Sequence, residues 1–490
     1  MVNKSGKLSR RKFIGTTGTA FAALTIVPNK VLAGRGYPQP SDLPNIACIG
    51  ISNQGCSDLK QIATPDVPIQ PLTAAQLAFL PKPAQEYARL VLEWEKPGPG
   101  QPEPKPVRHA NIYALCDVDS NYAAPVFAGY PKAKRYEDWR IMLEKEKSID
   151  GVVIATPDHN HAPIAAAFIR DKKHVYLQKP LAKTIYECRT LARLAKEYDV
   201  VTQMGNQGHA TEGTRQTVEW IQSGAIGVVR EVNCYTSSAM WAQGNLVRPP
   251  VMKVPKHLNW DIWLGPAPEK PYNQDIGHFV WRGLWDYGTG LMGDLGAHTL
   301  DAVVWALNLG YPNKIQATST EYSKDYFPIA ETVEYEFPER YTQGIGYMPS
   351  VKVRWVDGGI KPLRPSALEP GRELQNVIYI GDKGIIMHNS HGAMPELVPA
   401  NPDFKKPASW LERTPDNYVD WIDSIKARRK SHNDFSISAR LAEIMLLTNI
   451  ATRVQNSNKI LEYDAENMRI TNVPEANDLF HYDYRKGWSL

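Results

Sequence analysis

Short apolar runs alternate with helical patterns along residues 44–206, and this alternation constrains the fold more than any other feature of the sequence. The runs end at glycine or at a polar residue, as buried parallel strands do. Strands are predicted at 44–51, 110–117, 151–156, 174–177 and 200–204, and helices from Gly55 and over 137–147, 162–172 and 185–198. Strands joined by helices of this length form right-handed βαβ units. The sequence therefore predicts an α/β fold that begins with a Rossmann doubly wound sheet.

The segment from residue 64 to 106 interrupts this pattern with ten prolines. Each proline fixes φ and lacks a backbone donor, so a regular sheet is excluded. A helical pattern remains only at residues 84–96. We predict an inserted surface arm that serves subunit contact.

A different pattern begins after about residue 207. Apolar and polar residues alternate at 229–237, 314–320, 332–337, 344–355 and 376–380, and tryptophan and tyrosine are frequent. Alternation with period two is typical of antiparallel strands that have one solvated face. A chain of 490 residues also exceeds the usual size of a single core. We therefore predict a second domain, residues 207–490, built on an open, mostly antiparallel sheet.

Residues 1–33 have the pattern of an export signal. Ser9-Arg10-Arg11-Lys12-Phe13 is a twin-arginine motif, an apolar stretch follows it, and Val31-Leu32-Ala33 suits cleavage after Ala33. The twin-arginine route exports folded proteins. The sequence therefore predicts a periplasmic protein that folds before it leaves the cytoplasm.

Charge and composition exclude several classes of protein. The formal net charge of +4 comes from the leader, and the residues after it contain 50 basic and 52 acidic side chains, so no nucleic-acid partner is expected. No apolar run approaches the ~20 residues that a membrane span needs. Five cysteines without a C-x2-C pair exclude a disulfide-dense scaffold and give no zinc pattern.

A glycine turn, Gly50-Ile51-Ser52-Asn53-Gln54-Gly55, follows the first predicted strand. A dinucleotide fingerprint has glycine at the first, third and sixth positions, so Ser52 makes the match partial. Its side chain must point away from the phosphates or bind them through its hydroxyl. Asp117, at the end of the second strand, suits the ribose hydroxyls and favours NAD over NADP, although it could also cap a helix. We predict cofactor contacts at Gly50, Ser52, Asn53, Gln54, Gly55 and Asp117.

Three more specific motifs follow in order: Ala155-Thr156-Pro157-Asp158-His159-Asn160-His161, Gln178-Lys179-Pro180-Leu181 and Gly293-Asp294-Leu295-Gly296-Ala297-His298. This order resembles the Gfo/Idh/MocA family, which comprises glucose–fructose oxidoreductase, inositol dehydrogenase and relatives. The stretch from residue 474 to 488 resembles a secreted bacterial subgroup of that family. The resemblance implies a Rossmann domain, a C-terminal α/β domain, and NAD(P)-linked chemistry on sugars, cyclitols or their derivatives. It also implies a homo-oligomer, dimer or tetramer, joined through the open sheet.

The resemblance implies catalytic residues as well. Lys179 matches the lysine of the family's Glu-Lys-Pro motif, and Asp294 and His298 match its paired aspartate and histidine. Gln178 stands where the family usually has glutamate, so that carboxylate is absent here. We predict further cofactor contacts at Thr156, Pro157, His161, Gln178 and Lys179.

The chemistry of these residues agrees with alcohol oxidation. A histidine such as His298 has an unperturbed pKa near ~6.5, which suits exchange of the hydroxyl proton. Asp294 and His298 are four residues apart, so on a helix they share a face and could hold one substrate together. Lys179 ends a buried strand and would stabilise a developing alkoxide. Asp301, one turn beyond His298, either orients it or is a surface acid.

Other candidates come from histidines and aromatic residues. His159 and His161 lie at a strand–helix turn without a cysteine or carboxylate partner, so we predict phosphate binding or helix capping and no metal. His209 follows a strand end, and an aromatic–polar cluster precedes Asp294 at Trp281, Arg282, Trp285 and Tyr287. Flat aromatic faces suit sugar rings. We predict substrate contacts at His209, Trp285 and Tyr287.

Three functions stay open. The first is oxidation of a ring hydroxyl, at C3, of a sugar or glycoside by tightly bound NAD, which outside the cytoplasm must be regenerated by a second sugar or another acceptor. The second is glycoside cleavage with recycled NAD, by oxidation, elimination, hydration and reduction, with His209 or Tyr287 as an additional base. The third is a binding protein without catalysis, against which the intact Lys179, Asp294 and His298 argue.

Overall fold

The structure, a computed structural model, describes residues 42–94, 102, 105–237, 239, 241–342, 346–400 and 403–490. The predicted leader, residues 1–33, lies outside these ranges. Within them, no helix combines the length and the hydropathy that crossing a membrane requires.

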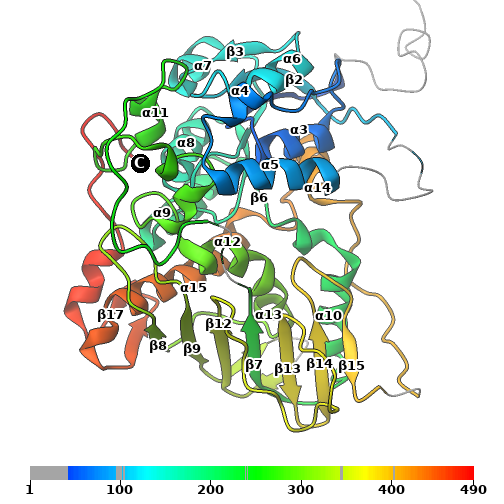
Figure 1. The fold of residues 1–490 in the computed structure, drawn as a ribbon. Coiled ribbons are helices and arrows are strands. Elements are labelled where there is room, and N and C mark those ends of the chain that lie inside the picture. Colours follow the sequence, from blue (N-terminus) through cyan, green and yellow to red (C-terminus); the bar gives the residue numbers. More distant parts are fainter. Residues whose placement is uncertain are drawn as a thin grey trace, which may run out of the picture. The chain divides into compact units, whose positions relative to one another are not determined.

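The first sheet, as far as the structure describes it, contains six parallel strands in the order β3-β2-β1-β4-β5-β6 (Figure 1). The strands are β1 Asn45–Ile49, β2 Asn111–Cys116, β3 Lys134–Tyr136, β4 Gly151–Ile154, β5 His174–Leu177 and β6 Thr202–Met204. The helices between them are α3 Gln54–Ile62, α6 Ala124–Gly129, α7 Trp139–Lys145, α8 Asp158–Arg170 and α9 Ile185–Glu197. The predicted Rossmann sheet is confirmed. Its strand order reverses between β1 and β4, the place where such sheets bind ligands.

Local signals in the sequence explain these elements. Val152, Val153 and Ile154 of β4 are fully buried, as expected for a parallel strand covered on both faces. α9 begins at a capping box, in which the side chains of Thr184 and Glu187 each accept a hydrogen bond from the other's backbone N–H. α8 begins four residues earlier than predicted, directly after Pro157.

The proline-rich insertion forms two helices, α4 (Ala74–Leu77) and α5 (Lys82–Trp94). Leu80 and Ala84 are buried in an apolar cluster with residues from the second half of the chain, among them Phe279. The inner side of the insertion therefore packs against the second half of the same chain. This contact was not part of the prediction of a surface arm for subunit contact.

The second sheet contains nine strands among the residues described, in the order β15-β14-β13-β7-β12-β9-β8-β16-β17. Their bounds are β7 Val229–Tyr235, β8 Lys314–Ser319, β9 Glu331–Phe337, β12 Val351–Val356, β13 Val377–Gly381, β14 Gly384–His388, β15 Glu396–Val398, β16 Leu461–Asp464 and β17 Arg469–Ile470. β7 and β12 pair in parallel, and the other neighbours pair antiparallel. The mostly antiparallel sheet is thus confirmed.

One predicted strand of this half is divided. Residues 344–355 contribute β11 (Gly346–Met348), which pairs with β10 (Arg340–Thr342), and then β12 in the large sheet. Pro349 lies between the two strands and lacks the donor that a continuous ladder needs.

Helices cover one face of the second sheet and separate it from the first half (Figure 1). They are α10 Glu212–Gln222, α12 Gly290–Thr299, α13 Asp301–Ala306 and α15 Phe435–Arg453. α15 contacts α9, α12 and β8, so it connects both halves. The remaining helices are α11 Trp260–Leu264, α14 Asn417–Ala427 and the 3-10 turns Gln207–Ala210, Gln274–Ile276, Val280–Gly283, Gln455–Ser457 and Pro474–Leu479.

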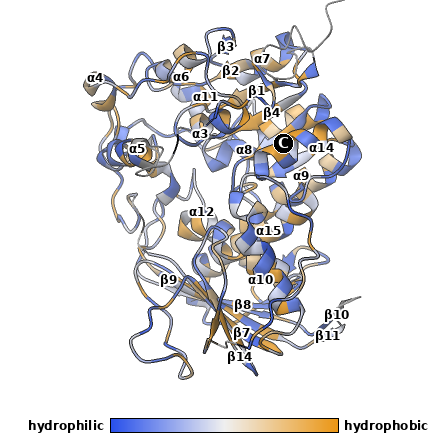
Figure 2. Ribbon diagram, turned by 90° about the vertical axis from the view of Figure 1, so that its right-hand side faces the viewer, coloured by the Kyte–Doolittle hydropathy of each residue, from blue (hydrophilic) through white to orange (hydrophobic). Residues whose placement is uncertain are grey.

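The two faces of the second sheet differ in chemistry. Figure 2 shows hydrophobic residues along the strands of both sheets. In β12, buried Val353 and Trp355 alternate with Lys352 and Arg354, which pair with Glu334. The face turned away from the helices is therefore polar at these positions.

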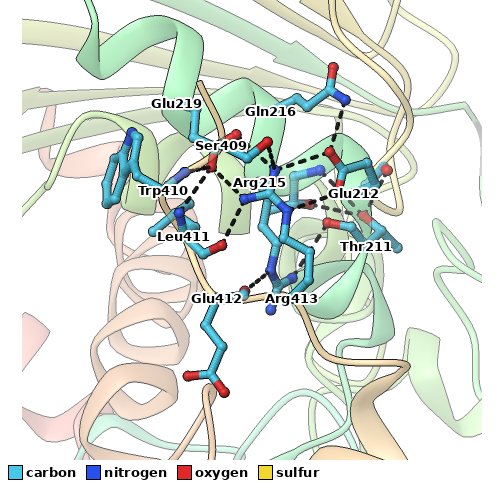
Figure 3. A network of polar contacts seen from close by, with 12 residues as sticks. Thr211, Glu212, Arg215, Gln216, Glu219, Ser409, Trp410, Leu411, Glu412 and Arg413 are labelled. Atoms are coloured by element: carbon cyan, nitrogen blue, oxygen red, sulfur yellow. Dashed lines mark hydrogen bonds and ion pairs between the residues drawn. The ribbon is translucent and has the colours of Figure 1, made fainter. Parts of the chain in front are cut away.

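After β15 the chain returns to the first half through residues 403–416 and α14, which contacts α3. Figure 3 shows the network that fixes this segment on α10. Arg413 donates to both Glu212 and Glu219, at 2.5–3.0 Å. Glu219 also accepts hydrogen bonds from the backbone N–H groups of Trp410 and Leu411.

Candidate active site

A pocket of about 790 Å³ opens at the carboxyl ends of β1, β2, β4 and β5 and extends to α12. Gly50, Asp117 and Lys179 line it from the first half, and Asp294 and His298 line it from the second. The pocket therefore lies at the switch point of the Rossmann sheet. It brings the predicted cofactor turn and the three predicted catalytic residues together.

The glycine turn requires glycine at its two ends. Gly50 has a φ of 76°, and a Cβ there would lie 2.7 Å from the carbonyl oxygen of Ala155. A Cβ at Gly55 would lie 1.9 Å from the carbonyl oxygen of Gly50. At the middle position, the Ser52 hydroxyl turns to Asp117 and lies 3.5 Å from its Oδ2. The backbone of the turn stays accessible to a diphosphate, so these residues fit NAD.

Asp117 organises the same turn from the end of β2. Its Oδ2 accepts from the N–H of Ile51 and its Oδ1 from the N–H of Asp119, both at 3.0 Å. Burial raises the pKa of Asp117 to about 6, although these hydrogen bonds oppose the rise. Asp117 lines the pocket together with other predicted cofactor positions, namely Ser52, Asn53, Gln54, Thr156, Pro157 and Gln178.

Asp58 explains why glutamine stands at position 178. The amide of Gln178 donates to both carboxylate oxygens of Asp58, at 3.0 and 2.9 Å. Gln54 and Tyr418 donate to the same carboxylate, at 2.8 and 2.7 Å. Burial raises the pKa of Asp58 to about 6 against these donors. A glutamate at position 178 would set a second carboxylate against Asp58, so the amide satisfies a buried acid that the sequence did not reveal.

The substitution Gln178→Glu is expected to lower the free energy of unfolding by about 1–3 kcal/mol near pH 8, because Asp58 loses a donor and gains a like charge. The two carboxyls would then share a proton, and their raised pKa means that the folded state binds more protons than the unfolded state. The loss should therefore shrink as the pH falls towards about 6. Urea unfolding at both pH values measures it. An equal loss at both would contradict the carboxylate contact.

Lys179, Asp294 and Arg282 form a charged group inside the pocket. Lys179 Nζ lies 2.6 Å from Asp294 Oδ1 and 3.1 Å from the Asp294 carbonyl oxygen. Arg282 Nε donates to the same carboxylate oxygen at 3.1 Å. Burial acts to raise the pKa of Asp294, but the two cations outweigh it and hold this pKa well below its usual range. Asp294 is therefore an ionised anchor that fixes the ammonium of Lys179.

His298 shares α12 with Asp294 and is 7% exposed. Burial, followed by the charge of Lys179, lowers its pKa well below 6.5. The imidazole is therefore neutral at pH 7 and able to accept a proton. Asp301 does not orient it, because the Asp301 carboxylate lies 2.9 Å from Nδ1 of His209.

Three histidines that the sequence analysis singled out form hydrogen bonds to other residues of the chain. Both ring nitrogens of His161 lie within 2.9 Å of backbone carbonyl oxygens, and those of His159 lie within 3.2 Å. His209 is 3% exposed and pairs with Asp301. The predicted cofactor contact of His161 and substrate contact of His209 need correction, since neither ring reaches the pocket. Across the described residues, no cluster of three or more His, Cys, Asp or Glu side chains is placed to hold a metal ion.

The predicted aromatic contacts also need correction. Trp285 packs on Phe327 and donates its Nε1–H to a backbone carbonyl, and Tyr287 is fully buried. Trp281 and Arg282 line the pocket instead. Trp281 and Arg282 belong to the 3-10 turn at Val280–Gly283, whereas Trp285 and Tyr287 follow that turn, so the two pairs point in different directions.

Asp158, Tyr87 and His391 are among the pocket residues that the sequence analysis missed. Asp158 is buried and accepts a hydrogen bond from Thr289 at 2.6 Å, and burial raises its pKa to about 7. Tyr87 comes from the insertion, and His391 comes from the loop between β14 and β15. Asp158 lies within a quoted motif and could have been found there. Nothing in the neighbouring sequence marked Tyr87 or His391.

The fold and the pocket define the class of protein: a two-part α/β chain with a dinucleotide-binding Rossmann half. Two family models match it, one described as "Oxidoreductase family, NAD-binding Rossmann fold" over residues 99–206, the other as "Oxidoreductase family, C-terminal alpha/beta domain" over residues 219–490. The chain therefore belongs to the Gfo/Idh/MocA family of oxidoreductases, and its cofactor is NAD.

Curated relatives match over shorter stretches. Levoglucosan dehydrogenase of Pseudarthrobacter phenanthrenivorans is 30% identical over 131 residues, which are 27% of this chain and 31% of the relative. Inositol 2-dehydrogenase of Salmonella typhimurium is 29% identical over 123 residues, 25% and 36% of the two chains. The 2,7-anhydro-N-acetylneuraminate hydratase of Escherichia coli is 28% identical over 99 residues, 20% and 26%. The matched stretches thus cover between about a quarter and about a third of the length of these relatives.

Solved structures share the fold along most of the chain. The WlbA dehydrogenase of Bordetella pertussis, in complex with NADH and UDP-GlcNAcA, has a TM-score of 0.53 at 13% identity, over 86% of this chain and 99% of that one. GenD2 from gentamicin A biosynthesis, in complex with NAD, has a TM-score of 0.52 at 16% identity, over 87% and 98%.

Proposed function

We propose that this protein uses NAD to oxidise a ring hydroxyl, at C3, of a sugar or glycoside. The observation that carries the proposal is the meeting of Lys179, Asp294 and His298 in the pocket that also contains the glycine turn. Two of the relatives are dehydrogenases, of levoglucosan and of inositol. Both names support a polyhydroxylated ring as the substrate.

The pocket residues supply the rest of the chemistry of an alcohol oxidation. Bound NAD supplies the hydride acceptor. Neutral His298 accepts the hydroxyl proton. Lys179, held by Asp294, presents its ammonium to the substrate oxygen as negative charge develops there. Arg282 donates a hydrogen bond to the same carboxylate of Asp294 and partly neutralises it. The ammonium of Lys179 is therefore not fully neutralised by Asp294 and stays available to the substrate.

We further propose that NAD stays bound between turnovers in a periplasmic homo-oligomer exported through the predicted leader. The insertion supports retention of the cofactor. Tyr87 of α5 lines the pocket and stacks on Phe279 with ring centroids 4.5 Å apart. Leu80 and Ala84 anchor the same segment in the apolar cluster. The insertion thus links the first half to the second beside the cofactor turn.

Replacing Leu80 with alanine is expected to speed NAD release at least about tenfold, because a buried leucine contributes roughly 2–5 kcal/mol to local packing. The measurement is the NAD content of the purified protein during dialysis. Leu363→Ala is the matched control, since Leu363 is 92% exposed. Retention equal to that of the control would contradict a role of the insertion.

Glycoside cleavage with recycled NAD is the second candidate. A hydratase among the relatives favours it, because a hydratase adds or removes water without net redox change. The additional base that cleavage requires was predicted at His209 or Tyr287. Both residues are buried outside the pocket lining, so neither can serve.

The absorbance of reduced nicotinamide tests both functions when methyl glycosides are added to the purified holoenzyme without free nucleotide. A lasting rise of one equivalent per subunit supports oxidation. Release of free sugar without a lasting rise supports cleavage. Binding of a glycoside without either change would favour the noncatalytic alternative and overturn the proposal.

A further inference from the structure

A second imidazole, that of His391, stands beside His298 in the pocket. The two rings stack with centroids 4.0 Å apart and planes 19° apart. Both residues line the pocket, but His391 is exposed whereas His298 is buried. The same pocket therefore presents two imidazoles side by side.

The loop holds His391 in an uncommon backbone conformation. Its φ is 63°, in the left-handed region that only a few per cent of residues other than glycine adopt, with asparagine, aspartate and histidine the most frequent among them. The flanking residues are anchored, because Ser390 bonds to Thr299 at 3.0 Å and Thr211 donates to the carbonyl of Gly392 at 2.8 Å. An uncommon conformation that the surroundings maintain next to a pocket is typical of functional sites.

The charges around His391 favour its neutral form. Although the residue is open to solvent, desolvation of the ring within the pocket wall lowers its pKa, the ammonium of Lys179 lowers it further, and Asp294 opposes the change. Its stacking partner His298 is neutral as well. An exposed, neutral imidazole can accept a proton from a bound substrate and exchange it with water.

We propose that His391 is a second base of the site, which removes the proton from the carbon adjacent to the carbonyl that oxidation produces. The inference rests on the proposed function, because that reaction forms the carbonyl. His391 supplies the additional base that glycoside cleavage requires. His209 and Tyr287, the residues predicted for this role, lie outside the pocket lining.

The step conserves atoms and electrons. The imidazole takes the proton from the adjacent carbon, whose C–H electron pair becomes a C=C bond while the carbonyl π pair moves to oxygen. The resulting enolate faces the ammonium of Lys179. Return of the proton regenerates the ketone. If the next carbon carries a glycosidic oxygen, the C–O bond breaks instead, and the oxygen leaves with the electron pair and takes up a proton.

Deuterium exchange tests this step directly. Holoenzyme is mixed in heavy water with the methyl glycoside that reduces its NAD, and NMR follows deuterium at the carbon next to the oxidised one. We expect exchange in the wild type. His391→Asn should lower the ratio of the exchange rate to the rate of NAD reduction at least about tenfold. Asparagine tolerates the left-handed conformation and is not a base, so the loop is preserved.

Two further variants separate a base from a structural residue. In His391→Gly, added imidazole should restore exchange, which a merely structural role would not allow. Met394→Ala, in the same loop at 49% exposure, should keep the wild-type ratio. An unchanged ratio in His391→Asn, or NAD reduction without exchange in the wild type, would overturn the role of His391 and leave oxidation intact. Absence of NAD reduction with every glycoside would instead contradict the proposed function.

Discussion

Lys179→Ala is expected to slow the reduction of bound NAD by glycoside about a hundredfold to a thousandfold, the usual effect of removing one donor that stabilises a developing oxyanion. The ammonium of Lys179 is held in the pocket by Asp294 at 2.6 Å, and no other lysine is among the lining residues described. The measurement is a single-turnover mixing experiment with the holoenzyme. Bound NAD should be retained, because the glycine turn and Asp117 are untouched.

The control for this variant is Lys145→Ala, at an exposed position on α7, which should react at the wild-type rate. A loss of less than tenfold in Lys179→Ala would show that the ammonium does not act on the substrate oxygen. Loss of NAD from the variant would assign Lys179 to cofactor binding instead.

Arg413→Ala is expected to lower the free energy of unfolding by about 3 kcal/mol near neutral pH. Glu219 is 2% exposed, and removing one partner of a buried ion pair leaves an uncompensated charge. Two backbone N–H groups still reach this carboxylate, which places the effect at the lower end of the usual range. Urea unfolding followed by circular dichroism measures it.

The pH dependence identifies the cause. Burial would raise the pKa of Glu219, but Arg413 and the backbone donors lower it to about 2. A depressed folded-state pKa gives stability above about pH 4.5 that is lost as the pH falls towards 2, so the difference between the two proteins should shrink in that window. Arg193→Ala breaks an exposed pair with Glu197 and should change the free energy of unfolding by less than about 1 kcal/mol. An equal effect of both substitutions would contradict the special role of Arg413.

The first sheet was predictable because a strand buried on both faces leaves an uninterrupted apolar run, as Gly151–Ile154 does. β3 was missed because it is an edge strand and is not buried on both faces. Lys134 and Arg135 are exposed, so this strand leaves no apolar run in the sequence. In the second sheet, alternation located β7 but could not show its parallel partner. That partner, β12, lies far along the chain, and local pattern carries no information about it.

The candidate site was predictable where several motifs constrained one another. Helical spacing placed Asp294 and His298 on one helix, but only the fold shows that Asp294 holds Lys179. The meaning of Gln178 depended on Asp58, a residue of an ordinary helix. Spacing was misleading for Trp285, since nearness in sequence to Asp294 does not fix the direction of a side chain on a tight turn.

The return of the chain through α14 has a consequence for biosynthesis. Translation releases β1 to β6 first, and amino-terminal domains commonly fold as they emerge from the ribosome. Here the phenol of Tyr418 donates to Asp58 at the base of the cofactor turn, yet it is synthesised only after β7 to β15. The nucleotide site therefore matures late in translation, and the nascent chain is close to full length before it can capture NAD in the finished pocket.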